Sequence, residues 1–381
     1  MCQKSLRVAA CVPLFALATG VCSALAAADA KLLAAATQAQ PAVVDSLKEM
    51  VLIESGSSDL DGLARMATLL DGRLKAMGFK TERRKATAGA GADIVVGTLE
   101  GTGKQRLMLQ GHMDTVYEKG ILAAQPYKLD GNRLYGPGIA DDKGGIAVIL
   151  HALKILADAG WRDYARLTVL FNPDEEVGSL GSGELIATLA DQHDTVLSFE
   201  PTAAKAVVKG EAVLLGARDL AKDIPGAALN WTNARAVKAL NQIPDTAEAL
   251  GDVRITQRGA DEKLLAALKA KVAAGKLVPD TETTVKLVMG RPPFVAGAPG
   301  RALAERARAI YAEIDRPLAI VDMTGGGTDA GYANRSGKAV VVESFGLAGF
   351  GYHARDEYIE LDSIVPRLYL VTRLMTELGR Q

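Results

Sequence analysis

Cysteine is almost missing from this chain: there are three among 381 residues, Cys2, Cys11 and Cys22, and all lie within the first 22 positions. The rest of the chain therefore has neither disulfide bonds nor thiolate metal ligands. Histidine is nearly as scarce, with four residues at positions 112, 151, 193 and 353. A metal site beyond the first 22 residues would have to use imidazole and carboxylate groups.

An excess of charge of either sign is also missing, since 44 Lys and Arg residues face 45 Asp and Glu residues. This balance gives no reason to expect nucleic acid or an anionic membrane surface as a partner.

The first 26 residues have the pattern of a secretory signal peptide. Lys4 and Arg7 precede a short apolar run over 8–21, and small residues follow up to Ala26. The run is shorter than the roughly 20 residues that span a bilayer. We expect cleavage after Ala26 and a secreted, periplasmic protein without a membrane partner; a retained anchor is the alternative.

The length favours two domains. Residues 27–204 and 297–381 alternate amphipathic helices with apolar strands, which predicts an α/β catalytic domain in two parts, with a mixed, partly parallel sheet flanked by helices. Residues 205–296 contain shorter strands and more charge, which predicts a small inserted α+β domain of the lid or dimerisation type.

Hydrophobic periodicity predicts the elements of both domains. In the α/β part we expect helices over 28–56, 58–79, 143–159, 182–190, 301–315 and 363–379, and strands over 93–100, 106–110, 167–171, 195–199 and 338–343. In the inserted part we expect helices over 212–222 and 261–274 and strands over 228–237, 250–257 and 283–289.

Three of these strands deliver histidine or carboxylate side chains at their carboxyl ends, where open α/β sheets place their sites. The Gly/Pro turn 135–145 and the Gly-rich stretch 349–353 carry similar residues. The candidates are His112 and Asp114 after the strand 106–110, Asp174, Glu175 and Glu176 after 167–171, Glu200 after 195–199, Asp141 and Asp142 in the turn, and His353. His151, within a helix, and His193, in a polar connector, are interpreted as structural.

Such residue types are typical of a co-catalytic metal centre. Histidine and carboxylate ligands without thiolate suit Zn²⁺. Two ions at about 3.5–4 Å need a bridging carboxylate, and one free carboxylate must act as a base. Asp114 can orient the imidazole of His112. The spacing alone does not separate the adjacent acids at 175 and 176, or those at 141 and 142, and Asp142 can also cap the following helix.

These motifs make the chain resemble the co-catalytic zinc carboxypeptidase and aminoacylase superfamily, and within it the bacterial glutamate carboxypeptidases that hydrolyse folates (the carboxypeptidase G type). The matching stretches extend over nearly all of the chain beyond residue 26. They are 111–117, 135–145, 168–178, 196–202, 290–292, 324–330 and 349–353.

The resemblance implies a role for each site residue. It implies two zinc ions, one held by His112, Asp141 and Glu200 and the other by Asp141, Glu176 and His353, with Glu175 as the general base.

The resemblance also implies substrate contacts. Arg291 and Arg254 match arginines that hold the carboxylates of a C-terminal glutamate, a task that suits a guanidinium fork, and Asn241 matches an asparagine near the cleft. The alternative for Arg254 is a cross-strand ion pair. The glycine-rich stretch 325–328 offers backbone N–H groups to an anion.

The inserted region departs from the family that the chain resembles. Family members carry a Ser-His-Ala-Gly type segment there, and its histidine reaches across a dimer to the partner's oxyanion. This chain has no histidine between His193 and His353. Compared with the family, a few tens of expected residues are absent at 207–217. The expected domain is therefore shortened, and this puts the homodimer and the full catalytic rate in question.

Three functions fit these features. The first is a metallocarboxypeptidase that cleaves the amide bond before a C-terminal glutamate in peptides or N-acyl-glutamates such as folates. The second is a related aminoacylase or dipeptidase of different specificity, and the third is a catalytically impaired periplasmic binding protein. We predict the first, because a protein that only binds has no evident need for all six metal-site groups.

Overall fold

The computed structural model describes residues 27–87, 91–202, 220–236, 247–255, 257, 259–274, 282–288, 290–321 and 327–381. The predicted signal peptide lies outside these ranges. Within them, no helix is long and apolar enough to cross a membrane.

A six-stranded sheet forms the centre of the larger part, with the strand order β1-β2-β6-β3-β7-β10. The four strands from β6 to β10 run parallel, whereas β1 and β2 are joined to them by antiparallel pairing. The strands are β1 (Lys80–Lys85), β2 (Asp93–Glu100), β3 (Arg106–His112), β6 (Arg166–Asn172), β7 (Thr195–Ser198) and β10 (Val340–Val342). The predicted mixed, partly parallel sheet is confirmed.

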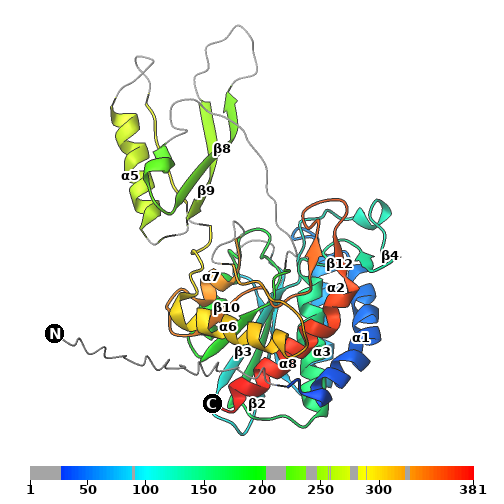
Figure 1. The fold of residues 1–381 in the computed structure, drawn as a ribbon. Coiled ribbons are helices and arrows are strands. Elements are labelled where there is room, and N and C mark those ends of the chain that lie inside the picture. Colours follow the sequence, from blue (N-terminus) through cyan, green and yellow to red (C-terminus); the bar gives the residue numbers. More distant parts are fainter. Residues whose placement is uncertain are drawn as a thin grey trace, which may run out of the picture.

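Helices cover both faces of this sheet (Figure 1). One face bears α1 (Ala30–Val51), α2 (Leu60–Ala76), α3 (Lys143–Asp158), α6 (Gly297–Ala312) and α8 (Ile364–Gly379), and the other bears α4 (Gly183–Ala190) and α7 (Ala330–Ala333).

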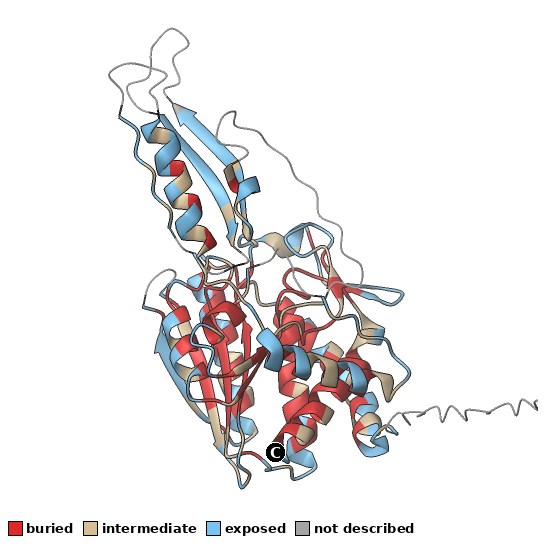
Figure 2. Ribbon diagram, turned by 60° about the vertical axis from the view of Figure 1, so that its left-hand side comes forward, coloured by how far each residue is buried: buried red, intermediate tan, exposed pale blue. Residues whose placement is uncertain are grey.

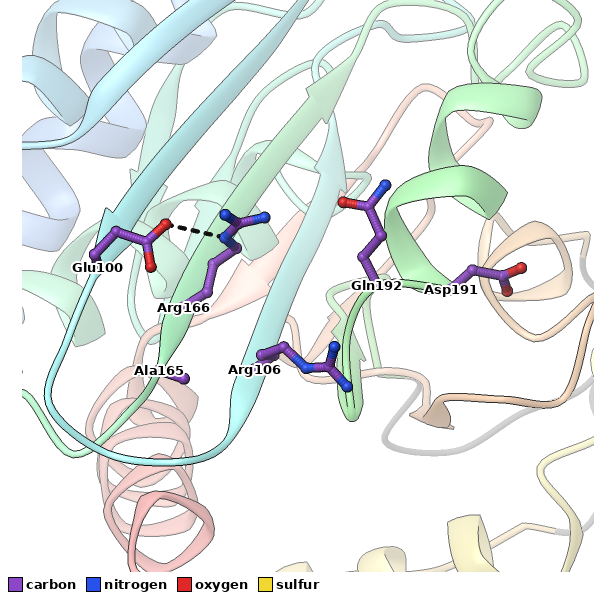
Figure 3. A pocket seen from close by; sticks show the side chains of 6 residues that line it. All are labelled: Glu100, Arg106, Ala165, Arg166, Asp191 and Gln192. Carbon is purple, nitrogen blue, oxygen red and sulfur yellow. Dashed lines mark hydrogen bonds and ion pairs between the residues drawn. The ribbon is translucent and has the colours of Figure 1, made fainter.

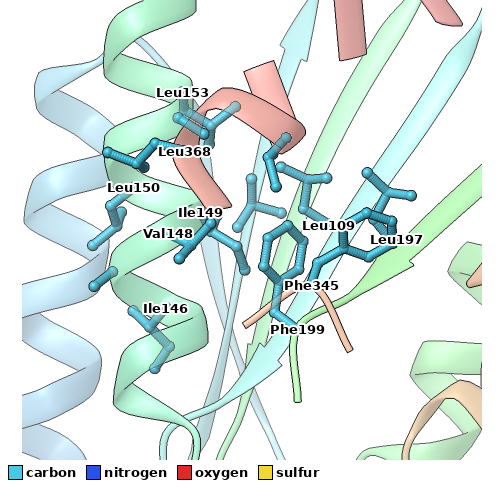
Figure 4. Packing of buried hydrophobic residues seen from close by; sticks show 14 of the residues in the cluster. Leu109, Ile146, Val148, Ile149, Leu150, Leu153, Leu197, Phe199, Phe345 and Leu368 are labelled. Atoms are coloured by element: carbon cyan, nitrogen blue, oxygen red, sulfur yellow. The ribbon is translucent and has the colours of Figure 1, made fainter. Parts of the chain in front are cut away.

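Alternation along each strand explains the two layers of core. On β3, Leu107 and Leu109 face the larger helical layer, and Met108 faces α4 and α7. Figure 4 shows Leu109 beside Leu197 of β7, with Ile149 of α3 in the same larger cluster. Both faces are buried, which is why the central strands are mostly apolar.

We did not predict β1 from the sequence, and the first two predicted helices are longer than α1 and α2. The side chains of β1 are charged or polar on both faces, as suits an edge strand, so no apolar pattern marks it. The first helix begins after Asp29, which caps it by accepting N–H groups from Lys31 and Leu32, and it ends at Val51.

A second, four-stranded antiparallel sheet has the order β11-β12-β5-β4. Its strands are β4 (Lys128–Asp130), β5 (Arg133–Tyr135), β11 (Gly349–Phe350) and β12 (Tyr358–Glu360); short 3₁₀ turns η1 (Ile121–Ala123) and η3 (Leu361–Ser363) lie nearby in the chain. None was predicted, because runs of two or three residues carry no measurable periodicity. This sheet brings the turn 135–145 next to the stretch 349–357.

The 3₁₀ turn η2 (Leu220–Asp223) and the elements β8 (Ala227–Ala236), β9 (Ala247–Ile255) and α5 (Ala260–Ala273) form a separate group, drawn apart from the central sheet in Figure 1. Ala221, Leu264 and Leu268 are the buried centre of its own small core. Most of β9 is exposed, in contrast to the buried central sheet (Figure 2).

Two predictions for this group need correction. Residues 283–288 form no strand; Val285 packs on the small core but Val288 is exposed, and a strand needs a pairing partner that this segment does not have among the described residues. Of the helix predicted over 212–222, the described part begins at 220 and is a 3₁₀ turn.

His151 of α3 has a structural role that can be tested. Its Nε2 lies 2.8 Å from the Ser46 hydroxyl on α1, and burial, followed by the charge of Arg73, lowers the pKa of His151 to about 4. A histidine whose folded pKa lies below the unfolded value near 6.5 adds stability above pH 6.5, and that stability is lost as the pH falls toward 4. His151→Gln should remove this dependence.

The measurement is urea unfolding of chelator-treated protein at pH 7.5 and pH 4.5. We expect the wild type to lose about 2 kcal/mol more than His151→Gln between these pH values. Lys154→Gln, on the exposed side of the same helix, should behave like the wild type. Equal losses in all three proteins would contradict the assignment.

Candidate metal centre

The carboxyl ends of three adjacent parallel strands place the candidate residues at one edge of the central sheet. His112 is the last residue of β3, Glu175 lies three residues beyond β6, and Glu200 lies two residues beyond β7. Since β6, β3 and β7 are neighbours, these side chains converge. Asp141 and His353 reach the same edge from the turns that the second sheet brings together.

Two groups of ligand-type side chains meet at this edge and share Asp141. One is His112, Asp141 and Glu200, and the other is Asp141, Glu176 and His353; within each group the ligand atoms lie within 4.8 Å of one another. Asp141 Oδ1 lies 2.9 Å from His112 Nε2, and Asp141 Oδ2 lies 3.2 Å from His353 Nε2. The two oxygens of one carboxylate thus face different groups, as a bridging ligand requires.

Asp114 contacts residues of both groups. Its Oδ1 lies 3.3 Å from His112 Nδ1 and accepts the N–H of Glu175 at 3.0 Å. Its Oδ2 accepts the N–H of Glu176 at 3.1 Å and the hydroxyl of Ser57 at 2.8 Å. The backbone carbonyl oxygen of Asp114 also lies 3.1 Å from His112 Nδ1. Asp114 therefore orients the imidazole of His112, and its carboxylate holds the backbone that carries the two glutamates.

The electrostatics of the edge fit divalent cations. Burial, followed by repulsion from Asp141 and Glu175, raises the pKa of Glu200. Burial also raises the pKa of Glu175, against the attraction of His112. Ionised carboxylates this close together repel one another unless positive charge lies between them. The imidazole and carboxylate donors match the ligands of a catalytic Zn²⁺ ion.

Glu175 belongs to neither group and contacts Arg291 instead. Glu175 Oε1 and Arg291 Nη1 form an ion pair, but its geometry is not that of a hydrogen bond, and Glu175 Oε1 has no hydrogen-bond donor. Arg291 Nε is also buried without an acceptor. The site therefore contains a carboxylate that belongs to neither ligand group, and a guanidinium whose Nε–H has no hydrogen-bond acceptor.

Comparison with known proteins identifies the family. The family model of Peptidase family M20/M25/M40 matches residues 108–377. This chain belongs to that family. The predicted superfamily is thereby confirmed. Peptidases of this family are metal-dependent, so the chain is a metallopeptidase, and its hydrolase class agrees with the prediction.

The similarity to other proteins covers nearly the whole of this M20-family peptidase. Carboxypeptidase G2 of Pseudomonas sp. (strain RS-16) is 42% identical, with 92% of each chain covered. The fold resembles an M20 family metallo-carboxypeptidase from Sulfolobus solfataricus, with a TM-score of 0.67 and 15% identity over 89% of this chain and 99% of that one. A tripeptidase from Staphylococcus aureus is similar, with a TM-score of 0.67 and 18% identity over 90% and 99%.

Of the residues predicted to contact the substrate, the structure describes Arg291 and Arg254 but not Asn241. Arg254 lies on β9 with 53% of its side chain exposed, and its Nε donates to Asp252 on the same strand at 2.8 Å. This pair is not the cross-strand pair considered above. Asn241 lies outside the described residues, as do Gly325 and Gly326 of the stretch 325–328.

Two acids near the candidate ligands, Asp142 and Glu343, have contacts that the sequence did not predict. Asp142 is the N-cap residue of α3, but its side chain makes no capping hydrogen bond. Its Oδ2 accepts the N–H of His112 at 3.2 Å instead, so a side-chain cap is not what Asp142 supplies. Glu343 Oε1 accepts the N–H of Glu200 at 3.2 Å. Glu343 ends the strand predicted over 338–343, so the rule applied to the other strands would have found it.

A hollow at the opposite edge of the sheet lies away from this chemistry. It is lined by Arg106 and Arg166, at the starts of β3 and β6, and by Glu100, Asp191 and neighbouring residues (Figure 3). Arg166 pairs with Glu100 and Arg106 with Asp194, so both guanidinium charges are matched. The groups that could hold a metal lie at the other edge of the sheet.

Proposed function

We propose that this peptidase is a di-zinc carboxypeptidase that cleaves the amide bond before a C-terminal glutamate in peptides or N-acyl-glutamates such as folates. The observation that carries the proposal is the pair of ligand groups sharing Asp141, with Glu175 left over beside them. The 42% identity to carboxypeptidase G2 supports the carboxypeptidase activity and the choice of substrate.

In this proposal the first ion is held by His112, Asp141 and Glu200 and the second by Asp141, Glu176 and His353. When bound, the ions supply a water of lowered pKa and Lewis acidity toward the scissile carbonyl. The donor set favours Zn²⁺, because it combines imidazole nitrogen with carboxylate oxygen.

Glu175 moves the proton. Its carboxylate accepts a proton from the attacking water and returns it to the nitrogen of the leaving amine. Burial raises the pKa of Glu175, which brings it toward the range in which a carboxyl can do both. Asp114 holds the Glu175 backbone, and so fixes the position of this base.

Arg291 recognises the substrate carboxylate. Its Nε is a buried donor without an acceptor, and a carboxylate that accepts from the guanidinium fork would satisfy it. A substrate that takes over the guanidinium also releases Glu175 Oε1 from its ion pair. Arg254 and Asn241 stay in the proposal as further substrate contacts, on the resemblance alone.

The test compares glutamate release from a folate-like substrate with release of neutral amino acids from matched N-acyl substrates, using zinc-loaded protein. We expect the wild type to prefer glutamate. Arg291→Gln should lower kcat/KM for glutamate about 30-fold or more, because a buried charge pair is lost, and should change the rate with neutral substrates far less.

Arg335→Gln, an exposed arginine that pairs with Glu184, is the matched control and should leave the preference intact. An equal rate with neutral amino acids in the wild type would favour an aminoacylase or dipeptidase. Tight binding without hydrolysis would favour a binding protein.

We propose further that residues 1–26 are a signal peptide that directs the chain to the periplasm, and that residues 205–296 form a shortened inserted domain between the catalytic parts 27–204 and 297–381. The alignment with carboxypeptidase G2 extends over 386 positions but takes in 92% of a 381-residue chain, so some positions of the relative have no counterpart here. Sedimentation would test whether the chain forms a homodimer.

A further inference from the structure

Glu357 lies buried beneath the turn that carries Asp141, with 2% of its surface exposed. Its Oε1 accepts the N–H groups of Ala140 and Asp141 at 2.8 and 3.0 Å. Its Oε2 accepts the N–H of Gly138 at 2.8 Å. One side chain therefore fixes the backbone of the turn at three positions, up to the shared ligand itself.

Tyr117 connects this carboxylate to the stretch that carries His353. The Tyr117 hydroxyl lies 2.8 Å from Glu357 Oε2 and 2.7 Å from the carbonyl oxygen of Ala354, the residue after His353. Its single proton is shared between these two acceptors. Tyr117 and Glu357 together join the turn of Asp141 to the turn of His353, and we call this pair the clamp.

Lys143 compensates the charge of the clamp. Its ammonium group is buried and donates to the carbonyl oxygens of Ile53 and Pro137 at 3.2 and 3.1 Å. Burial lowers the pKa of Lys143 to about 8, and the nearby charge of Glu357 opposes this shift. A buried carboxylate with three N–H donors and a neighbouring cation forms a stable support.

The two ligand groups differ in how they are supported. His112 is the last residue of β3 and Glu200 lies two residues beyond β7, and His112 is 2% exposed. His353 lies in a turn beyond the two-residue strand β11, with a backbone φ of +63° and 54% of its side chain exposed. A non-glycine residue in this region needs support from its surroundings. The second group therefore depends on its turn.

We propose that Tyr117 and Glu357 are positioning residues that hold Asp141 and His353 at the spacing of the second cation site, and so set the affinity of that site with little effect on the first. The proposal rests on the proposed two-ion function. Neither residue contacts the reacting atoms in this assignment; each acts through a ligand.

The experiment titrates Zn²⁺, and separately Co²⁺ with its absorption bands as a readout, into metal-free full-length protein by calorimetry. The variants are Tyr117→Phe and Glu357→Gln, with Tyr358→Phe and the exposed Glu118→Gln as matched controls. Supporting residues of metal ligands typically contribute 10- to 100-fold in affinity. We expect that loss at the weaker site in both variants, and less than about threefold change at the tighter site.

A second measurement separates positioning from general destabilisation. Excess Zn²⁺ should restore kcat of Tyr117→Phe toward the wild-type value, because the second site refills, whereas a misfolded site would not recover. Tyr117→Phe removes one hydroxyl and keeps the ring, so it stays informative if Glu357→Gln fails to fold.

The outcomes separate the two proposals. Wild-type protein that takes up no divalent metal would overturn the metal centre, and the clamp with it. Wild type with two sites, combined with variants that weaken both sites equally or neither, would overturn the clamp alone.

Discussion

Glu175→Gln is expected to lower kcat by about 100- to 10,000-fold while leaving two metal ions bound, because it removes a general base without removing a ligand. The amide keeps the shape of the carboxylate but cannot accept the proton of the attacking water. Glu175 belongs to neither ligand group, so metal content should not change. The measurements are steady-state glutamate release and metal content by atomic absorption.

The adjacent variant Glu176→Gln is the sharpest comparison, because Glu176 belongs to the second ligand group. It should lose affinity for one ion, and excess zinc should recover part of its activity. Glu184→Gln, exposed on α4, should match the wild type in both measurements. Turnover retained in Glu175→Gln would show that the base has been assigned to the wrong side chain.

Asp141→Asn should abolish measurable turnover and reduce the metal content from two ions to less than one per chain. Asp141 is the member common to both groups, and its two oxygens face different imidazoles. The asparagine keeps one oxygen and turns an amide nitrogen toward the other imidazole. The loss in affinity at each site should exceed the 10- to 100-fold effect of a supporting residue.

Variants that change only one ligand group provide the comparison for Asp141→Asn. Glu200→Gln and His353→Ala each remove a member of one group, and each should weaken one ion. Asp158→Asn, an exposed aspartate paired with Lys154, should leave both ions in place. Two ions retained by Asp141→Asn at the wild-type affinity would rule out the bridging role.

The clamp bears on how the second ion of the proposed centre would be held. In the described part of the chain, the first ligand group takes His112 and Glu200 from strand ends of the central sheet, whereas the second takes His353 from an exposed turn. Metal loss on dilution or at low zinc should therefore begin at the second group.

The sequence by itself determined the central sheet and the place of the chemistry. Apolar runs such as 107–109 and 167–171 must be buried on both faces, which requires parallel strands under helices, and the carboxyl ends of neighbouring parallel strands lie at one edge. His112, the acids at 174–176 and Glu200 could be expected there for that reason. The family resemblance then implied different roles for Glu175 and Glu176, and for Asp141 and Asp142, which spacing could not separate.

Only the tertiary structure decided the support of the site. The contacts of Glu357 with Asp141 and Tyr117 join residues 216 and 240 positions apart, and no local pattern marks them. The strands β4, β5, β11 and β12 are too short for periodicity, yet their pairing brings the turns of Asp141 and His353 together. Hydrophobic patterning reports which face of an element is buried, whereas the partner of a buried polar group depends on how distant segments pack.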